Sequence, residues 1–126
     1  MHLTNETMEI KLKRVYDPAE PADGYRVLID RLWPRGIKKG DLPMDEWAKD
    51  LAPSTPLRRF FHADQEANWT EFAERYEAEL RVSPATRNIL RSWQDRDLSC
   101  VTLLLGSSNA EHNHGLVLKR VLESYL

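Results

Sequence analysis

The sequence contains a single cysteine, Cys100, and no apolar run long enough to cross a bilayer. One cysteine excludes an internal disulfide and is typical of a protein from a reducing compartment. The longest apolar stretch, residues 101–105, is interrupted by a threonine, whereas a membrane helix needs about 20 apolar residues. The first ten residues also lack the basic start, apolar middle and cleavage site of a secretory signal. We therefore expect a cytoplasmic protein with no membrane partner.

Several common catalytic and cofactor signatures are absent as well. The chain has no GxxxxGK(S/T) phosphate loop, no GxGxxG dinucleotide loop and no GxSxG nucleophile elbow. His112 and His114 are spaced poorly for joint metal binding on a helix, and His62 with Asp64 is remote from them. Cys100 begins an apolar run, where a thiol is usually an inert small hydrophobe. We predict no metal and no cofactor.

The length and composition of the chain fit one small globular domain. The chain has 126 residues, of which 41% are hydrophobic and 30% charged, and a chain of this size buries a core without disulfides or structural metal. No repeat, linker or low-complexity tract divides it. We expect a single domain over residues 1–126, with residues 1–8 as a loose N-terminal tail.

Hydrophobic periodicity predicts three strands. Alternation over residues 9–15 and β-forming residues over 25–29 predict the first two, and the apolar run over 101–105 predicts a third, covered on both faces. A fourth short strand could lie within a loop. The predicted fold class is α/β: a small, mainly parallel sheet of three or four strands flanked by helices, with a long helical crossover between strands two and three.

Start signals and apolar spacing predict the helices. Prolines at 43 and 53 bound a first helix, and Thr55-Pro56 opens a short second one. Asn68 precedes the clearest helix, whose apolar face consists of Trp69, Phe72, Tyr76 and Leu80. Ser83-Pro84 opens the next helix, with an inner face of Ala85, Ile89 and Trp93, and residues 112–115 open a C-terminal helix.

Basic side chains are concentrated early in the chain. Residues 11–39 carry eight basic and four acidic side chains, whereas residues 40–81 carry five basic and ten acidic ones. This distribution favours a local cationic site over a uniformly basic surface for duplex nucleic acid. Two solvated faces of opposite sign are the plainer alternative.

Polar residues follow the second and third predicted strands, and the carboxyl ends of parallel strands share one edge of the sheet, where α/β proteins bind ligands. Arginine suits forked recognition of phosphate or carboxylate, and a glycine-hydroxyl loop before a helix offers backbone N–H groups to an anion. We take Asp30 and His112 as candidates for proton transfer. The candidate binding residues are Arg14, Arg31, Arg35, Ser107, Ser108 and Asn113.

Each candidate also has a purely structural interpretation. Asp30 and the arginines could form an ion-pair network that locks loops, with Trp33-Pro34 as packing. His112 and Asn113 could be solvent-exposed polar residues, with Asn113 capping the last helix. Under the ligand interpretation, Arg31 and Arg35 are held by a stiff Trp-Pro turn and form an anion clamp.

Two sequence blocks and a series of single residues carry a family resemblance. The blocks are RVYD at 14–17 and DGYRVLIDRLWPRG at 23–36; the other matches are Trp47, residues 51–54, Leu57, Arg58, Phe61, His62, Trp69, Phe72, Tyr76, Glu79, Leu80, residues 101–104, His112 and Asn113. From residue 10 onward the chain resembles the YeaO-like proteins, which belong to the domain of unknown function numbered 488. The resemblance implies a compact prokaryotic α/β domain without an established activity.

The chain departs from that family after the third predicted strand. Family members commonly carry an aromatic residue, a lysine and an aspartate where this chain has Leu105, Ser108 and Asn109. If that lysine and aspartate take part in chemistry, this chain has lost them or uses Ser108 and Asn109 instead. More distant relatives carry cysteine and histidine near the C-terminus. Residues 112–114 contain no cysteine, so a thiol mechanism is not implied.

Three functions remain open from the sequence. The first is an enzyme, or the remnant of one, that acts on an anionic small molecule or nucleotide through an arginine-lined site. The second is a non-catalytic module that binds an anion, a nucleotide, a nucleic-acid end or an acidic protein segment at the same edge. The third is a structural partner, with tryptophans buried between subunits. The sequence does not decide between a monomer and a homodimer, or whether nucleic acid is a partner.

Overall fold

Four parallel strands form the sheet, in the spatial order β1-β4-β2-β3. The computed structural model describes residues 8–126, and its strands are β1 (Glu9–Arg14), β2 (Tyr25–Leu28), β3 (Glu46–Trp47) and β4 (Cys100–Leu105). The last strand in the chain therefore lies between the first two: Leu103 of β4 is opposite Leu12 on one side and Val27 on the other. The predicted α/β class and the small parallel sheet are confirmed.

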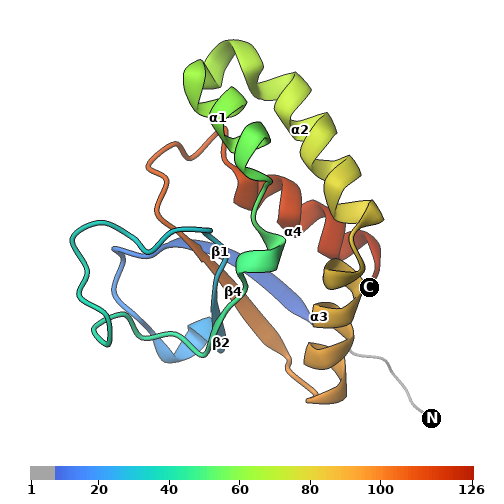
Figure 1. The fold of residues 1–126 in the computed structure, drawn as a ribbon. Coiled ribbons are helices and arrows are strands. Elements are labelled where there is room, and N and C mark those ends of the chain that lie inside the picture. The colour runs from blue at the N-terminus through green and yellow to red at the C-terminus, as the bar shows by residue number, and fades with distance from the viewer. Residues whose placement is uncertain (1–7) are drawn as a thin grey trace.

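The helices lie on one side of this sheet, and loops cover the other (Figure 1). The helices are α1 (Thr55–Ala63), α2 (Gln65–Val82), α3 (Pro84–Asp95) and α4 (His114–Ser124), with short 3-10 turns η1 (Pro21–Asp23) and η2 (Lys49–Leu51). On the helix side, alternate strand residues join the main hydrophobic core: Ile10, Val27, Ile29, Val101, Leu103 and Leu105. No helix in the described part of the chain is long and apolar enough to span a membrane.

The opposite side has a smaller core beneath the loop between β2 and η2. Leu28 and Leu104 point to this side and form a cluster with Val15 and Leu42, against which Trp33 and Trp47 pack. The predicted strand over 101–105 is thus covered on both faces, and all five of its residues are buried. Continuous apolar sequence is expected of a strand in that position.

The predicted helix over residues 43–52 is wrong. This segment instead forms the edge strand β3 and the turn η2. Trp47 is opposite Leu28 in the parallel register, and the N–H of Ala48 donates to the carbonyl of Leu28 at 2.8 Å. The outer edge of β2 gains a hydrogen-bonding partner in this way. The segment therefore pairs as a strand, although its four-residue apolar spacing favoured a helix.

Three helix starts or faces differ from expectation by a few residues. Ser54 rather than Thr55 is the N-cap of α1, and α2 begins at Gln65 because the Asp64 side chain accepts from the N–H of Ala67. The buried face of α3 consists of Thr86, Leu90 and Trp93, and the buried hydroxyl of Thr86 donates to the carbonyl of Leu80. Residues 1–7 of the expected tail lie outside the described residues, and Met8 is buried.

Candidate functional site

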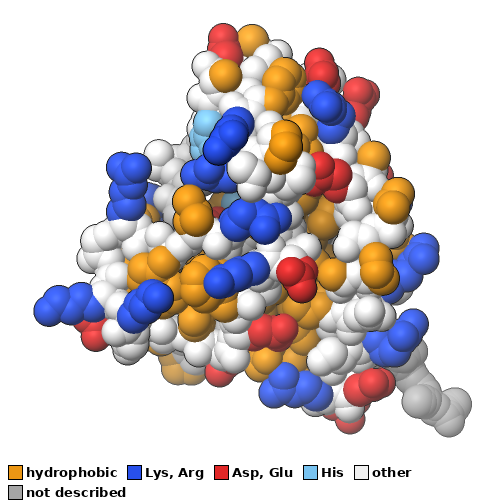
Figure 2. Space-filling model, in the orientation of Figure 1, with side chains coloured by type: hydrophobic (Ala, Val, Ile, Leu, Met, Phe, Trp, Pro, Cys, Tyr) orange, Lys and Arg blue, Asp and Glu red, His pale blue; other side chains and the backbone are white. Residues whose placement is uncertain are grey.

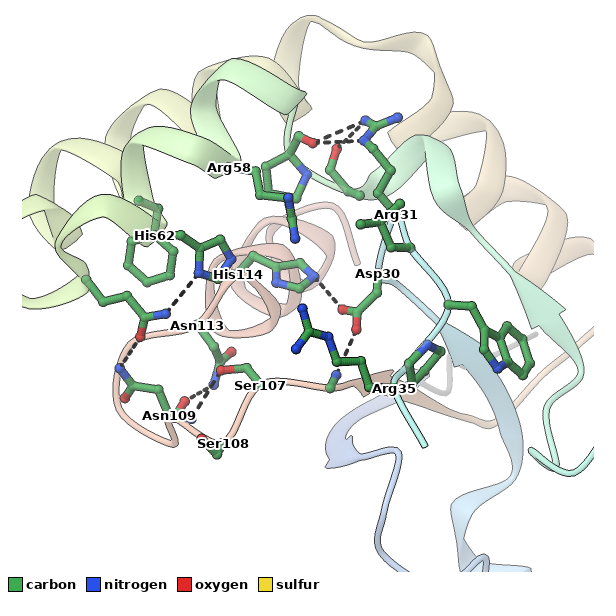
Figure 3. Close-up of a pocket in the computed structure, with 18 of the residues that line it drawn as sticks. Asp30, Arg31, Arg35, Arg58, His62, Ser107, Ser108, Asn109, Asn113 and His114 are labelled. Atoms are coloured by element: carbon green, nitrogen blue, oxygen red, sulfur yellow. Dashed lines mark hydrogen bonds and ion pairs between the residues drawn. The ribbon is translucent and has the colours of Figure 1, made fainter. Parts of the chain in front are cut away.

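A pocket of about 480 Å³ lies at the carboxyl edge of the sheet. It is lined by residues 30–35, which follow β2, by residues 106–109, which follow β4, and by one side of α1 together with the start of α4. Because β2 and β4 are adjacent and parallel, their ends bring residues far apart in the sequence to one place. Figure 3 shows this arrangement.

Asp30 and His114 form a fixed pair in the wall of the pocket. The Asp30 carboxylate accepts from the N–H of Gly106 at 2.8 Å through Oδ2, and its Oδ1 lies 3.3 Å from Nε2 of His114. That same nitrogen lies 3.2 Å from the carbonyl oxygen of Ile29. Since both neighbours of Nε2 are acceptors, this nitrogen carries a proton and donates. Both oxygens of Asp30 are therefore engaged within the protein.

Two arginine side chains extend into the pocket from different elements. Arg35 comes from the loop after β2 and Arg58 from α1, and both guanidinium groups point toward the His114–Asp30 pair (Figure 3). Within residues 8–126, neither guanidinium group makes a hydrogen bond or an ion pair. They are the cationic groups in this pocket whose donors are unused.

Arg31 lines the same pocket, but its guanidinium group is partly engaged, through Nε and Nη2. It donates to the carbonyl of Pro53 at 3.1 Å and more weakly to that of Ala52 at 3.5 Å. These bonds tie the loop after β2 to the segment that leads into α1. Arg31 therefore shapes the pocket wall, and within residues 8–126 Arg35 and Arg58 are the pocket arginines whose guanidinium groups bond to no other protein atom.

His62 is the second histidine of the pocket, and its hydrogen bonds define its tautomer. Gln65 accepts from Asn109 through Oε1 at 2.9 Å, so its amide nitrogen faces Nδ1 of His62 at 3.1 Å. Nδ1 is therefore an acceptor, and the proton of the neutral ring is on Nε2. Desolvation lowers the pKa of His62, and the nearby charges of Arg58 and His114 lower it further, with Asp30 opposing. His62 is thus a neutral donor at pH 7.

Arg14 and Tyr16 support the pocket from behind. Arg14 Nε donates to the carbonyl of Ser107 at 3.1 Å, and its guanidinium group lies 5.0 Å from the centre of the Tyr16 ring. The Tyr16 hydroxyl in turn donates to the carbonyl of Arg35 at 2.8 Å. This chain of contacts connects the two loops that carry most of the polar lining.

Of the remaining site residues proposed from the sequence, some line the pocket and one lies outside it. Ser107, Ser108 and Asn113 line the pocket, and Asn113 also caps α4 by accepting from the N–H of Leu116 at 3.0 Å. His112 does not line it: its ring stacks on Trp69 with centroids 4.9 Å apart. Residues 8–126 contain no group of three or more side chains placed to hold a metal ion.

A model of the inactive DUF488-N3 subclade matches residues 9–126. The chain belongs to this subclade. It is 48% identical to the uncharacterized protein YeaO of Escherichia coli over 117 residues, which cover 93% of this chain and 99% of YeaO. It is 41% identical over 113 residues to the uncharacterized proteins Mb3100c of Mycobacterium bovis and Rv3073c of Mycobacterium tuberculosis, covering 90% of this chain and 92% of each relative. No solved structure matched the chain.

Three pocket residues of this subclade member, Arg58, His62 and His114, were not among the site residues proposed from the sequence, although each had a signal. Arg58 and His62 lie four residues apart, one position beyond the buried Leu57 and Phe61, so they flank the inner stripe of α1. His114 is the first residue of α4 after its cap. The capping interpretation of Asn113 already placed His114 in the first turn of the last helix, and His114 lines the pocket.

Proposed function

We propose that the pocket binds a small anionic molecule without transforming it. The supporting observation is the charge of the lining: three arginines against one carboxylate, Asp30, with two histidines that add N–H donors. The chain as a whole has 18 basic and 20 acidic side chains, so this local excess is not a reflection of overall charge. A concave site lined by one sign of charge attracts and concentrates ligands of the opposite sign.

The partners of Asp30 and the residue types at positions 108 and 109 favour binding over catalysis. Asp30 accepts the N–H of Gly106 through one oxygen and directs the other at His114, so both carboxylate oxygens already have a partner within the protein. Ser108 and Asn109 occupy the positions where the family resemblance implies a lysine and an aspartate, and both line the pocket. The description of the subclade as inactive agrees with this interpretation.

An enzyme acting on the same anion is the second candidate, and one contact favours it. His114 is 3.3 Å from Asp30, and a carboxylate that orients a histidine is a common proton-transfer arrangement. Incubating stoichiometric protein with phosphate esters and assaying free phosphate tests this candidate. Release that is lost in His114→Asn but kept in His112→Asn would establish the enzyme; no release supports the binding module.

The test of anion binding is a thermal shift. A ligand that binds only the folded state raises the melting temperature, so we expect phosphate and sulfate to stabilise the protein more than chloride at equal ionic strength. Replacing Arg35 and Arg58 together by lysine keeps the charge and removes the planar fork, so the shift should largely vanish.

Arg59 provides the matched control. It neighbours Arg58 on α1 but is exposed and does not line the pocket. Arg59→Lys should keep the full shift. If the double variant also keeps it, bulk charge rather than this pocket accounts for the effect, and the proposal fails.

A further inference from the structure

The pocket is larger than an inorganic anion requires. Its volume of about 480 Å³ lies within the range of roughly 300–1,000 Å³ that is typical of sites for organic ligands. The groups available to an anion, Arg35, Arg58 and His62, account for only part of the lining. A ligand that fills the pocket must therefore have a second part beyond its anionic group.

One wall of the pocket is apolar. Leu32, Trp33, Pro34, Ala52, Pro53, Phe61 and Phe72 belong to it. Leu32 is 60% exposed although it sits among these apolar neighbours, and an exposed leucine at a pocket rim gains free energy when a ligand covers it. Figure 2 shows hydrophobic and basic side chains together around the hollow on this face.

The apolar wall is held in place before any ligand arrives. Arg31 donates to the carbonyls of Ala52 and Pro53 and so fixes the loop that carries Leu32 against the start of α1. Proline at 34 further restricts this loop. A preformed wall loses little conformational entropy on binding, so apolar contact with it contributes to affinity.

The cationic part of the pocket matches a terminal phosphate. Arg35 and Arg58 approach from different elements, and the neutral His62 adds a third donor. Three separate donor groups suit the three terminal oxygens of a phosphate monoester, and guanidinium groups bind such oxygens in pairs.

We propose that the ligand is a phosphate monoester of a ring-sized apolar group, with the phosphate at Arg35 and Arg58 and the ring against Leu32. This inference rests on the proposed function, whose anion it extends to a ligand class. The ring is the part that distinguishes this ligand from free phosphate or sulfate.

Calorimetric titration with three probes tests the inference: inorganic phosphate, glycerol phosphate and phenyl phosphate, at constant ionic strength. We expect phenyl phosphate to bind about tenfold tighter than the other two, because only its ring covers apolar surface. Leu32→Ser should remove most of this advantage and leave the affinity for inorganic phosphate unchanged. Val82→Ser is the matched control, since Val82 is 84% exposed and does not line the pocket; it should change neither affinity.

The outcomes separate this inference from the proposed function. If inorganic phosphate does not bind, or binds equally well after lysine replaces Arg35 and Arg58, the proposed function fails and the inference fails with it. If phosphate binds through these arginines but phenyl phosphate binds no tighter, only the inference is overturned. A phenyl phosphate advantage that survives Leu32→Ser also overturns it, because the ring then lies elsewhere.

Discussion

The two faces of the sheet are stabilised in different ways. On the helix side, strand residues such as Val27, Val101 and Leu103 pack against four helices in one continuous hydrophobic core. On the loop side, Leu28 and Leu104 join a smaller apolar cluster, and beside it the sheet carries charged residues.

Asp23 is the centre of the charged part of the loop side. It is 4% exposed and forms ion pairs with Arg26 and with Lys13, the latter at 3.0 Å. Its backbone carbonyl accepts from the hydroxyl of Thr102 on β4 at 2.6 Å. The comparison shows that a helix layer can cover a sheet face by apolar packing alone, whereas a short loop needs specific polar contacts to stay in place.

Adjacent residues of β4 allow the two faces to be compared directly, because Leu103 and Leu104 are both fully buried and point to opposite sides. Leu103→Ala should cost about 4–5 kcal/mol, near the top of the range for such truncations, because the helices around it cannot collapse into the cavity. Leu104→Ala should cost about 3 kcal/mol, because the loop over residues 30–45 can relax. Urea titration of both variants measures the difference, and equal costs would show that the loop is as rigid as the helix layer.

Removing the central charge of the loop side should have the next largest effect. Asp23→Asn leaves Arg26 buried with its ion pair broken, and we expect a loss of about 3 kcal/mol, the lower end of the range for buried pairs because Lys13 is partly exposed. The measurement is again urea unfolding. No loss would mean that the polar contacts do not hold this loop.

The same carboxylate predicts a pH dependence. Burial alone would raise the pKa of Asp23, but the N–H of Glu20 and the side chains of Lys13 and Arg26 lower it below the ordinary value of 3.8. A group with a lowered folded pKa stabilises the fold above its unfolded pKa, and this contribution is lost as pH falls through the folded value. Stability should therefore fall below about pH 4, and by less in Asp23→Asn than in the wild type. Parallel acid dependence in the two proteins would contradict this assignment.

The smallest effect should come from an exposed ion pair on the outer side of α2. Glu71 and Arg75 are 3.1 Å apart, with side chains 60% and 58% exposed. Glu71→Gln should cost no more than about 0.3–0.5 kcal/mol, as helix pairs in water usually do. A stability loss close to that of Asp23→Asn would show that exposed and buried ion pairs contribute equally to the stability of this protein.

Local sequence patterns predicted the fold wherever local chemistry decides it. The apolar run of β4 and the cap-and-proline start of α3 at Ser83 each depend on neighbouring residues, and both are found. The strand β3 could not be predicted at residues 46–47, because it exists only through pairing with β2. A periodic spacing of proline, tryptophan and leucine was misleading there.

The residues of the candidate site also include some that could be predicted from the sequence and some that could not. Asp30, Arg35, Ser107 and Ser108 were predictable because they lie in the loops that follow β2 and β4, and strand ends share an edge in a parallel sheet. Arg58 and His62 enter the pocket through the docking of α1; their spacing places them on one side of that helix but does not show which part of the fold this side faces. The engagement of Arg31 by the carbonyls of Ala52 and Pro53 also depends on that docking.

The position of β4 between β1 and β2 has a consequence for synthesis of the chain. Glu9 pairs with Cys100, and Tyr25 pairs with Val101, so the two N-terminal strands lack their central neighbour until most of the chain has left the ribosome. Such long sequence separation slows folding because loop closure precedes the stabilising contacts. We expect nascent chains that end before residue 100 to remain protease-sensitive, and protection to appear only when β4 and α4 have emerged. Early protection of shorter chains would show that the helices form a stable unit without the sheet.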